Sequence, residues 1–261
     1  AVRSGIRDQG SGIGRGAGVS VGLQIRPEPS RTMAVMSPVL ALAITVLIGV
    51  ALFVALGKDP LRGLAMFFYE PVKDARALAE IGLKATPLVL IALGLAACFR
   101  SNVWNIGAEG QFILGAIAGG WVAMQAGPGT TRWIVVAVLV AGTLGGMFWA
   151  AIVAFLRDRF NANEILVSLM LVYVADMTLS YLVYGPWKDP QGYNFPQTIT
   201  FAASSRIPRL VDAYRTNIGL VIALVAVAGL WLHLFRTYGG FQLQVGGLAP
   251  HAARYAGFSS R

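Results

Sequence analysis

Six mostly apolar stretches, separated by more polar segments, dominate the chain between residues 34 and 235. They cover residues 34–56, 86–99, 106–126, 133–156, 165–184 and 218–235. A helix needs about 20 apolar residues to cross roughly 30 Å of hydrocarbon, and most of these stretches approach or exceed that length. Stretch 86–99 is short, and Pro87 near its start suits the first turn of a helix. The pattern predicts an all-α, polytopic membrane protein with about six transmembrane segments, one or more of them discontinuous.

The polar segments divide the chain into three parts. Residues 1–33 are rich in Gly, Ser and Arg and predict a flexible cytoplasmic tail, and residues 34–235 predict a transmembrane domain. Within that domain, we expect residues 58–84 to form an extramembrane loop and residues 185–217 to form a longer loop, rich in Pro, Gly and aromatic residues, outside the cytoplasm. Residues 236–261 are amphiphilic and rich in small residues, and form the third part.

Composition agrees with this organisation. The chain is 56% hydrophobic and 13% charged, as expected for a membrane protein. Its net charge of +9 comes from basic residues scattered through loops without a nucleic-acid-binding motif, so anionic lipid headgroups are the expected neighbours and nucleic acid is not. Cys98 is the only cysteine, which excludes a disulfide framework and a Cys-based metal site. No P-loop and no HExxH motif occurs, so we expect neither an enzyme nor a cofactor.

Residues 102–121, NVWNIGAEGQFILGAIAGGW, place polar side chains and five glycines within a largely apolar region. A charged group near a bilayer centre costs at least roughly 2.5 to 3.5 kcal/mol, so Glu109 is expected to face the protein interior or a water-lined path. The glycines permit a broken helix and close helix contact. An alternative is that the glycines only pack helices and that Glu109 stabilises a helix start just after Asn105.

Two further features lie in the later apolar stretches. Asp176 is a second acid in an apolar segment. It is a candidate for the path, or else a polar residue that bonds a neighbouring helix or reaches water at the interface. Gly142 and Gly146 form a GxxxG pattern, which favours close packing against another helix.

The stretch SNVWNIGAEGQFILGA resembles permease subunits of bacterial ABC importers for nucleosides and simple sugars, in the branched-chain amino acid and ribose permease superfamily. The match is strongest at residues 105–111. FNANEILVSLMLVYVA, followed by YGPWKDPQGYNFPQT, resembles the same family. The resemblance implies that the first stretch belongs to the core around a translocation path, with these candidate residues: Asn102, Asn105, Glu109, Gln111 and Asp176.

GGLAPHAARYAGF, within the last part of the chain, resembles the cytoplasmic coupling segment of that family. We expect a short helix that begins at Pro250, whose fixed φ suits a first turn, and ends at Gly257 in a left-handed conformation. Small side chains would allow close approach to a partner, and Arg254 would bond an acidic residue on it. The coupling candidates are Gly247, Pro250, Ala252, Ala253, Arg254, Tyr255 and Gly257.

The resemblance also implies partners: cytoplasmic ATP-binding subunits, a second permease subunit, an extracytoplasmic substrate-binding protein and the lipid bilayer. Lysine and arginine divide almost evenly between the two sides, so charge does not decide orientation. The expected location is the bacterial inner membrane. A cytoplasmic coupling segment after six spans places the N-terminus on the cytoplasmic side of that membrane. An ion-coupled secondary transporter and a degenerate structural subunit remain as alternatives.

The chain departs from the family pattern in the last part. The family usually has polar or basic residues at the positions of Gln242 and Gln244, and commonly Asn at the position of Ala249. Family members continue with further membrane helices, whereas this chain stops at Arg261. We therefore expect an incomplete version of the family fold.

Overall fold

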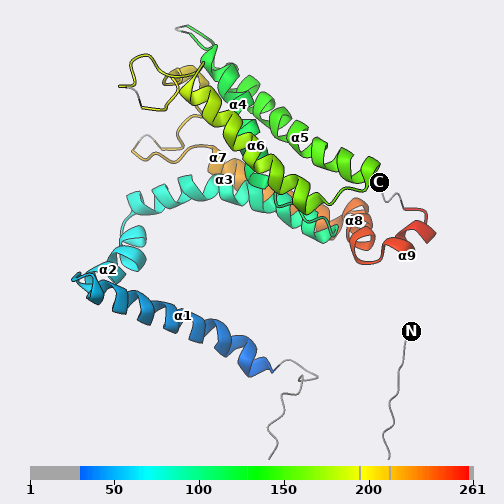
Figure 1. Ribbon diagram of the computed structural model, residues 1–261, viewed down its shortest axis with the longest axis horizontal. Coiled ribbons are helices and arrows are strands. Elements are labelled where there is room, and N and C mark those ends of the chain that lie inside the picture. The colour runs from blue at the N-terminus through cyan, green and yellow to red at the C-terminus, as the bar shows by residue number, and fades with distance from the viewer. Residues whose placement is uncertain (1–29, 128, 194, 212, 259–261) are drawn as a thin grey trace, which may run out of the picture. The chain divides into compact units, whose positions relative to one another are not determined.

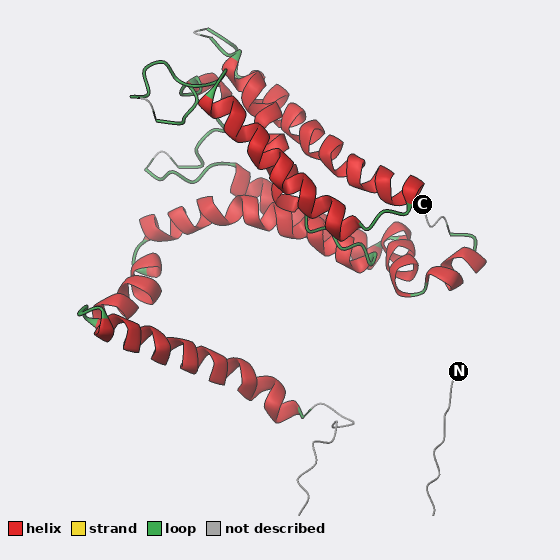
Figure 2. Cartoon of the chain, viewed as in Figure 1, coloured by secondary structure: helices red, strands yellow, loops and turns green. Residues whose placement is uncertain are grey.

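The computed structural model describes residues 30–127, 129–193, 195–211 and 213–258, and every named element in these ranges is helical (Figure 2). The α-helices are α1 (Arg31–Ala55), α2 (Pro60–Leu64), α3 (Ala75–Arg100), α4 (Ala108–Met124), α5 (Ile134–Phe160), α6 (Glu164–Tyr184), α7 (Gly219–Arg236), α8 (Tyr238–Leu248) and α9 (Pro250–Tyr255). Single turns η1 (Ala65–Tyr69), η2 (Glu70–Val72) and η3 (Ala203–Ser205) complete the set. The all-α prediction is confirmed. The predicted tail at 1–33 lies outside the described residues as far as residue 29, and α1 begins at Arg31, earlier than expected.

Five helices are long and apolar enough to cross a membrane, judged by length and composition: α1 from Thr32, α3, α5, α6 and α7. The remaining expected segment, 106–126, corresponds to α4, which has 17 residues. At 1.5 Å per residue α4 is only about 25 Å long, less than the hydrocarbon thickness. The chain is therefore a polytopic membrane protein in which one of the apolar segments is shorter than a full crossing.

The chain divides into two compact units, residues 1–67 and residues 68–261. In the first unit, Ser30 accepts a hydrogen bond from the Met33 amide and caps α1, and Asp59 caps α2 through the amides of Leu61 and Arg62. Helix α2 folds back on α1, so that a Cβ on Gly63 would lie 2.7 Å from the Phe53 ring. Capping side chains thus define both helix starts in this unit.

Helix α3 corrects two predictions in the second unit. It runs unbroken for 26 residues from Ala75, so residues 75–84 are helical rather than loop, and the short stretch 86–99 is part of a longer helix that does not begin at Pro87. Asp74 starts the helix by accepting from the Ala77 amide at 2.7 Å. Pro87 lies inside the helix, where the Thr86 hydroxyl donates to the Gly82 carbonyl at 2.8 Å. A strong cap followed by good helix formers outweighs the proline.

Helix α4 packs mainly on α5 and α6, and its contact with α5 is made through glycines. A Cβ on Gly115 would lie 2.9 Å from the Gly142 carbonyl oxygen, and one on Gly145 would lie 2.6 Å from Ala118 Cβ. A Cβ on Gly146 would lie 3.2 Å from the Gln111 carbonyl oxygen. The predicted GxxxG face therefore does bring two helix backbones together, with Gly145 between its two glycines.

A second group of helices consists of α3, α7, α8 and α9, in which α3 packs on α7 and α8 packs on both. Figure 1 shows α8 and α9 at the end of this unit where α3, α5 and α7 finish. The loop 185–217 and the α4–α5 connection lie at the opposite end. Two isolated bridges, Lys188 with Thr198 and Arg209 with Asn217, order that loop. Each end of the loop therefore forms its own short hairpin-like turn.

Gly145→Ala is expected to destabilise the second unit, because the added methyl group meets Ala118 Cβ at 2.6 Å and the Leu114 carbonyl at 2.9 Å. Overpacking of this kind typically costs about 1 to 3 kcal/mol. The measurement is the thermal unfolding midpoint in detergent. Gly94→Ala is the matched control, because no atom lies within 4 Å of a Cβ at that position of α3. Equal midpoints for the two variants would contradict the close α4–α5 contact.

Candidate functional site

The start of α4 is recessed along its neighbours. A Cβ on Gly107 would lie 2.8 Å from Ser168 Cβ, and one on Gly110 would lie 3.1 Å from both Trp149 Nε1 and Val172 Cα. Trp149 is in the middle part of α5, about 16 Å from its C-terminal end at 1.5 Å per residue. The first turn of α4 therefore lies beside the middle of α5 and one to two turns inward from the start of α6.

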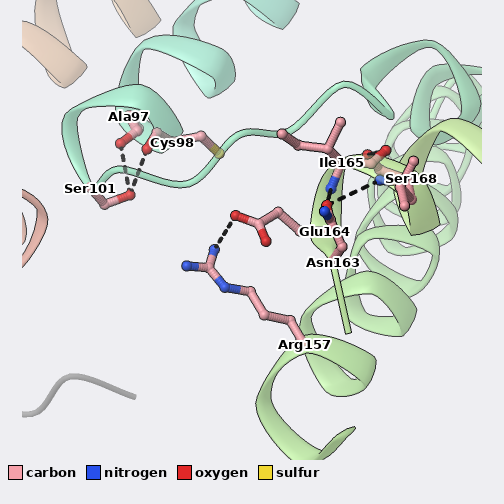
Figure 3. Close-up of polar contacts among 9 residues, drawn as sticks. Ala97, Cys98, Ser101, Arg157, Asn163, Glu164, Ile165 and Ser168 are labelled. Atoms are coloured by element: carbon pink, nitrogen blue, oxygen red, sulfur yellow. Dashed lines mark hydrogen bonds and ion pairs between the residues drawn. The ribbon is translucent and has the colours of Figure 1, made fainter. Parts of the chain in front are cut away.

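A loop of residues 101–107 leads from the end of α3 to this recessed position. The Ser101 hydroxyl donates to the carbonyls of Ala97 and Cys98 at 3.2 and 2.8 Å (Figure 3). Asn102 adopts a left-handed φ of 57°, and the Val103 amide donates to the Cys98 carbonyl at 2.9 Å. These bonds close the end of α3 and redirect the chain along the helices.

Asn105 and Gln111 form a reciprocal pair of carboxamides. The Asn105 amide group donates to Gln111 Oε1, and the Gln111 amide group donates to Asn105 Oδ1, both at 3.3 Å. Asn105 Oδ1 also accepts from the Gly107 amide at 3.0 Å. The two side chains were predicted to line a path, and their bonds instead join the loop to the first turns of α4.

Glu109 lies in the first turn of α4, where a carboxylate is favoured by the helix dipole. Its side chain is exposed and makes no hydrogen bond or ion pair with any residue that the structure describes. Glu109 was expected to face the protein interior or a water-lined path, and in this chain it points away from the glycine face used by α5 and α6. The alternative, a carboxylate at a helix start, matches the geometry.

The other two path candidates are also exposed. Asn102 is at the start of the loop, and Asp176 lies on α6 one turn beyond Val172 but on its outward side. Asp176 has no polar partner among the described residues. Of the five candidates, the structure joins Asn105 and Gln111 by hydrogen bonds. Asn102 and Glu109 are exposed on the same stretch of chain, and Asp176 is exposed on α6.

An ion pair closes the neighbouring turn between α5 and α6. Arg157 Nη1 lies 3.3 Å from Glu164 Oε1, and Asn163 Oδ1 caps α6 by accepting from the amides of Ile165 and Leu166 (Figure 3). Asn161 reverses the chain with a φ of 52°. The opposite charges of Arg157 and Glu164, seven residues apart, are a signal of this turn that the sequence already offers.

The helix predicted between Pro250 and Gly257 is present as α9. Pro250 is at its first position, and Gly257 follows its end with a φ of +78°. The rings of Tyr238, Phe241 and Phe258 lie 6.0 to 6.5 Å apart and join the end of the chain to α8. Both predicted ends of the helix are confirmed.

One expectation about this segment is wrong. Ala253 was expected to face a partner, but it is fully buried, at 0% exposure, because α9 turns that side towards α8. The most exposed large side chains nearby are Leu248 at the end of α8 and Tyr255 in α9, which are 85% and 95% exposed. Ala252 is exposed as well.

Helix α8 is fixed to the ends of α3 and α7. A Cβ on Gly247 would lie 2.5 Å from the Arg100 carbonyl oxygen and 2.8 Å from Ser101 Cα. Gln244 Nε2 donates to the Leu234 carbonyl at 2.6 Å, and Gln244 Oε1 accepts from Arg100 Nη1 at 3.3 Å. Sequence reasoning noted Gln244 only as a departure from a family pattern. Here it connects the coupling segment to both helices.

These features define a class of protein: a polytopic helical membrane protein with a recessed helix start inside its bundle and a small helical hairpin fixed to one end. The chain belongs to the family described as branched-chain amino acid transport system / permease component, whose model matches residues 77–261. The resemblance found in residues 105–111 is thereby confirmed at the level of the family.

Curated relatives extend the comparison. The chain is 33% identical over 251 residues to a glucose ABC transporter permease protein of Haloferax volcanii, covering 91% of this chain and 66% of the relative. It is 27% identical to a guanosine ABC transporter permease protein of Bacillus subtilis, covering 88% and 66%, and 28% identical to a nucleoside ABC transporter permease protein of Lactococcus lactis, covering 89% and 66%. The chain thus spans slightly less than two thirds of the length of these relatives. No solved structure matches it.

Gln111→Leu is expected to loosen the 101–107 loop, because Asn105 loses its partner and cannot turn its amide without losing the bond from the Gly107 amide. The loss of a neutral hydrogen bond is worth about 1 kcal/mol. The measurement is hydrogen exchange at residues 101–107, which should quicken. Gln125→Leu is the control, since Gln125 is exposed at the other end of α4. Unchanged exchange in Gln111→Leu would contradict the bracing role.

Proposed function

We propose that the chain is a membrane-spanning permease subunit of an ABC importer that forms the path for a nucleoside or a simple sugar. The observation that carries this proposal is the family match over residues 77–261. Relatives named for glucose, guanosine and nucleoside transport support the choice of solute. ATP hydrolysis then belongs to separate cytoplasmic subunits, and the chain itself is not an enzyme.

The recessed start of α4 supports a path beside residues 102–111. A helix start that is recessed within a membrane bundle offers unpaired amide groups and a positive dipole end to a polar solute. Glu109 is exposed there on this chain, and a carboxylate at such a depth is costly against lipid. In the proposal, Glu109 faces the aqueous path, Asn105 and Gln111 hold the loop in place, and a second permease subunit encloses the opposite side.

The helical hairpin α8–α9 is the proposed docking site for the ATP-binding subunit. Leu248 and Tyr255 project from it, and a large exposed aromatic residue beside an aliphatic one suits the centre of a protein interface. Gly247 and Gln244 fix the hairpin to α3 and α7, so a push on α8 reaches the start of the 101–107 loop directly. Gly247 is therefore a transmission residue rather than a docking residue.

The proposal also sets the orientation in the bacterial inner membrane. Docking places α8 and α9 on the cytoplasmic side, and the loop 185–217 at the other end of the unit then faces outward (Figure 1). There it meets an extracytoplasmic substrate-binding protein. With α1 as a further crossing, the N-terminus is cytoplasmic.

Tyr255→Ala is expected to weaken binding of the ATP-binding subunit by about tenfold or more, the scale of an interface hot spot. The matched control is Tyr193→Ala, an equally exposed tyrosine in the loop 185–217. The measurement is pull-down of the ATP-binding subunit by each variant, and ATP-dependent uptake is measured with the reconstituted wild-type complex. Wild-type binding by Tyr255→Ala would remove α9 as the docking site, and an absence of ATP-dependent uptake by the wild-type complex would overturn the permease assignment.

Orientation is tested by two matched alanine positions in a Cys98→Ser background. Ala203→Cys lies in the loop 185–217 and Ala252→Cys lies in α9, and both alanines are exposed. A membrane-impermeant thiol reagent added to intact cells is expected to label Ala203→Cys at once and Ala252→Cys only after the membrane is opened. The reverse pattern would show that the chain is inserted the other way round.

A further inference from the structure

Two arginines share one pair of aromatic rings where α3 and α7 end. Arg100 is the last residue of α3, and Arg236 is the last residue of α7. The guanidinium carbon of Arg100 lies 5.0 Å from the centre of the Phe235 ring, and that of Arg236 lies 5.6 Å from the centre of the Trp231 ring. The centres of the two rings are 6.3 Å apart. We call these four residues the arginine–aromatic cluster.

The positive charge of this cluster is not balanced by the chain. Neither arginine forms an ion pair with any residue that the structure describes, whereas Arg157 at the end of α5 is paired with Glu164. Arg100 donates one N–H group to Gln244 Oε1 at 3.3 Å. Because a guanidinium carries five N–H donors, most of those in the cluster remain available to a ligand. Two positive charges therefore lie on one surface without a carboxylate beside them.

The cluster is accessible and lies at the end of a membrane span. Trp231 and Phe235 are each 50% exposed, and both arginines are exposed as well. Helix α7 is long and apolar enough to cross a membrane. At 1.5 Å per residue, Trp231 lies about 8 Å from the end of this helix. The cluster therefore occupies the depth at which tryptophan is enriched in membrane proteins and at which lipid phosphate groups lie.

An apolar stripe runs along α7 from the cluster towards the other end of the helix. It consists of exposed side chains at spacings of four, three and four residues: Leu224, Ala228, Trp231 and Phe235. Helix α7 packs on α3 and α8 through a different side, where Leu234 is buried. A hydrocarbon chain that lies along this stripe would therefore place a polar group attached to its end beside the two arginines.

We propose that the arginine–aromatic cluster binds the headgroup phosphate of an anionic phospholipid, whose acyl chain lies along the stripe. The planar guanidinium groups suit a phosphate, and the ring faces hold them in place. A zwitterionic headgroup would bring its own positive charge towards the arginines. A soluble acidic protein could reach Arg236 but not Leu224, which lies about 18 Å inside the span. The site requires only that α3 and α7 cross the membrane, and the proposed function adds that it faces the cytoplasmic leaflet, which is rich in anionic lipid.

The full chain in phosphatidylcholine vesicles tests the site through quenching of tryptophan fluorescence by lipids with brominated acyl chains. The signal of Trp231 is the difference between each chain and its Trp231→Phe counterpart. Brominated phosphatidylglycerol is expected to quench this signal at about 25-fold lower mole fraction than brominated phosphatidylcholine, because each basic residue contributes about fivefold at an anionic surface. Arg236→Gln, which leaves the bond between Arg100 and Gln244 intact, is expected to reduce the preference about fivefold, and Arg100→Gln together with Arg236→Gln should abolish it.

Arg132→Gln is the matched control, because Arg132 is an exposed arginine beside an exposed tryptophan, Trp133, in the α4–α5 connection. It should keep the full preference. An unchanged preference in the double variant, or an equal loss in Arg132→Gln, would overturn the site. Loss of the preference on adding inorganic phosphate at constant ionic strength would indicate a soluble anion instead of a lipid. Weaker pull-down of the ATP-binding subunit by Arg236→Gln, with an unchanged lipid preference, would assign the cluster to a protein contact. The quenching measurement requires no uptake, so its failure would leave the proposed function standing.

Discussion

The close approach of two helix backbones, Gly115 on α4 against Gly142 on α5, is the contact on which the second unit depends. It lets α4, a helix too short to cross the membrane alone, lie deep among longer helices. Because α4 starts at mid-length of α5, the chain must return inward from the end of α3 to reach it. The bonds between Asn105 and Gln111 then hold that return path in one shape. The close packing of α4 on α5 thus determines where the candidate path lies.

A second set of close contacts connects this region to the cytoplasmic docking site of the proposed function. Gly247 lies against the last carbonyl of α3, and Gln244 bonds both Arg100 and the end of α7. The loop 101–107 begins at that same point. A displacement of α8 therefore acts on α3 and on the loop together, whereas α4, α5 and α6 form a separate packed group. Relative movement of these two groups would change the surroundings of Glu109 without breaking either glycine contact.

The faces of α6 illustrate how side-chain size separates two roles along one helix. Small or short side chains, Ser168 and Ala175, occupy the side that packs on α4, and bulky aromatic residues occupy the side that does not. Asp176 is also exposed on α6. Side-chain size therefore separates the side of α6 that packs on α4 from the side that stays exposed.

The sequence by itself determined the helical class, the membrane location and the family, because apolar length and the run at residues 105–111 are local properties of the chain. It also predicted both ends of α9, since Pro250 and Gly257 act through their own backbone geometry. Only the tertiary structure decided that α3 is continuous, that Glu109 is exposed and that Ala253 is buried. Each of these depends on which side of a helix meets another helix. When every side of a helix is apolar, the 3.6-residue period of the sequence does not indicate which side packs against a neighbour.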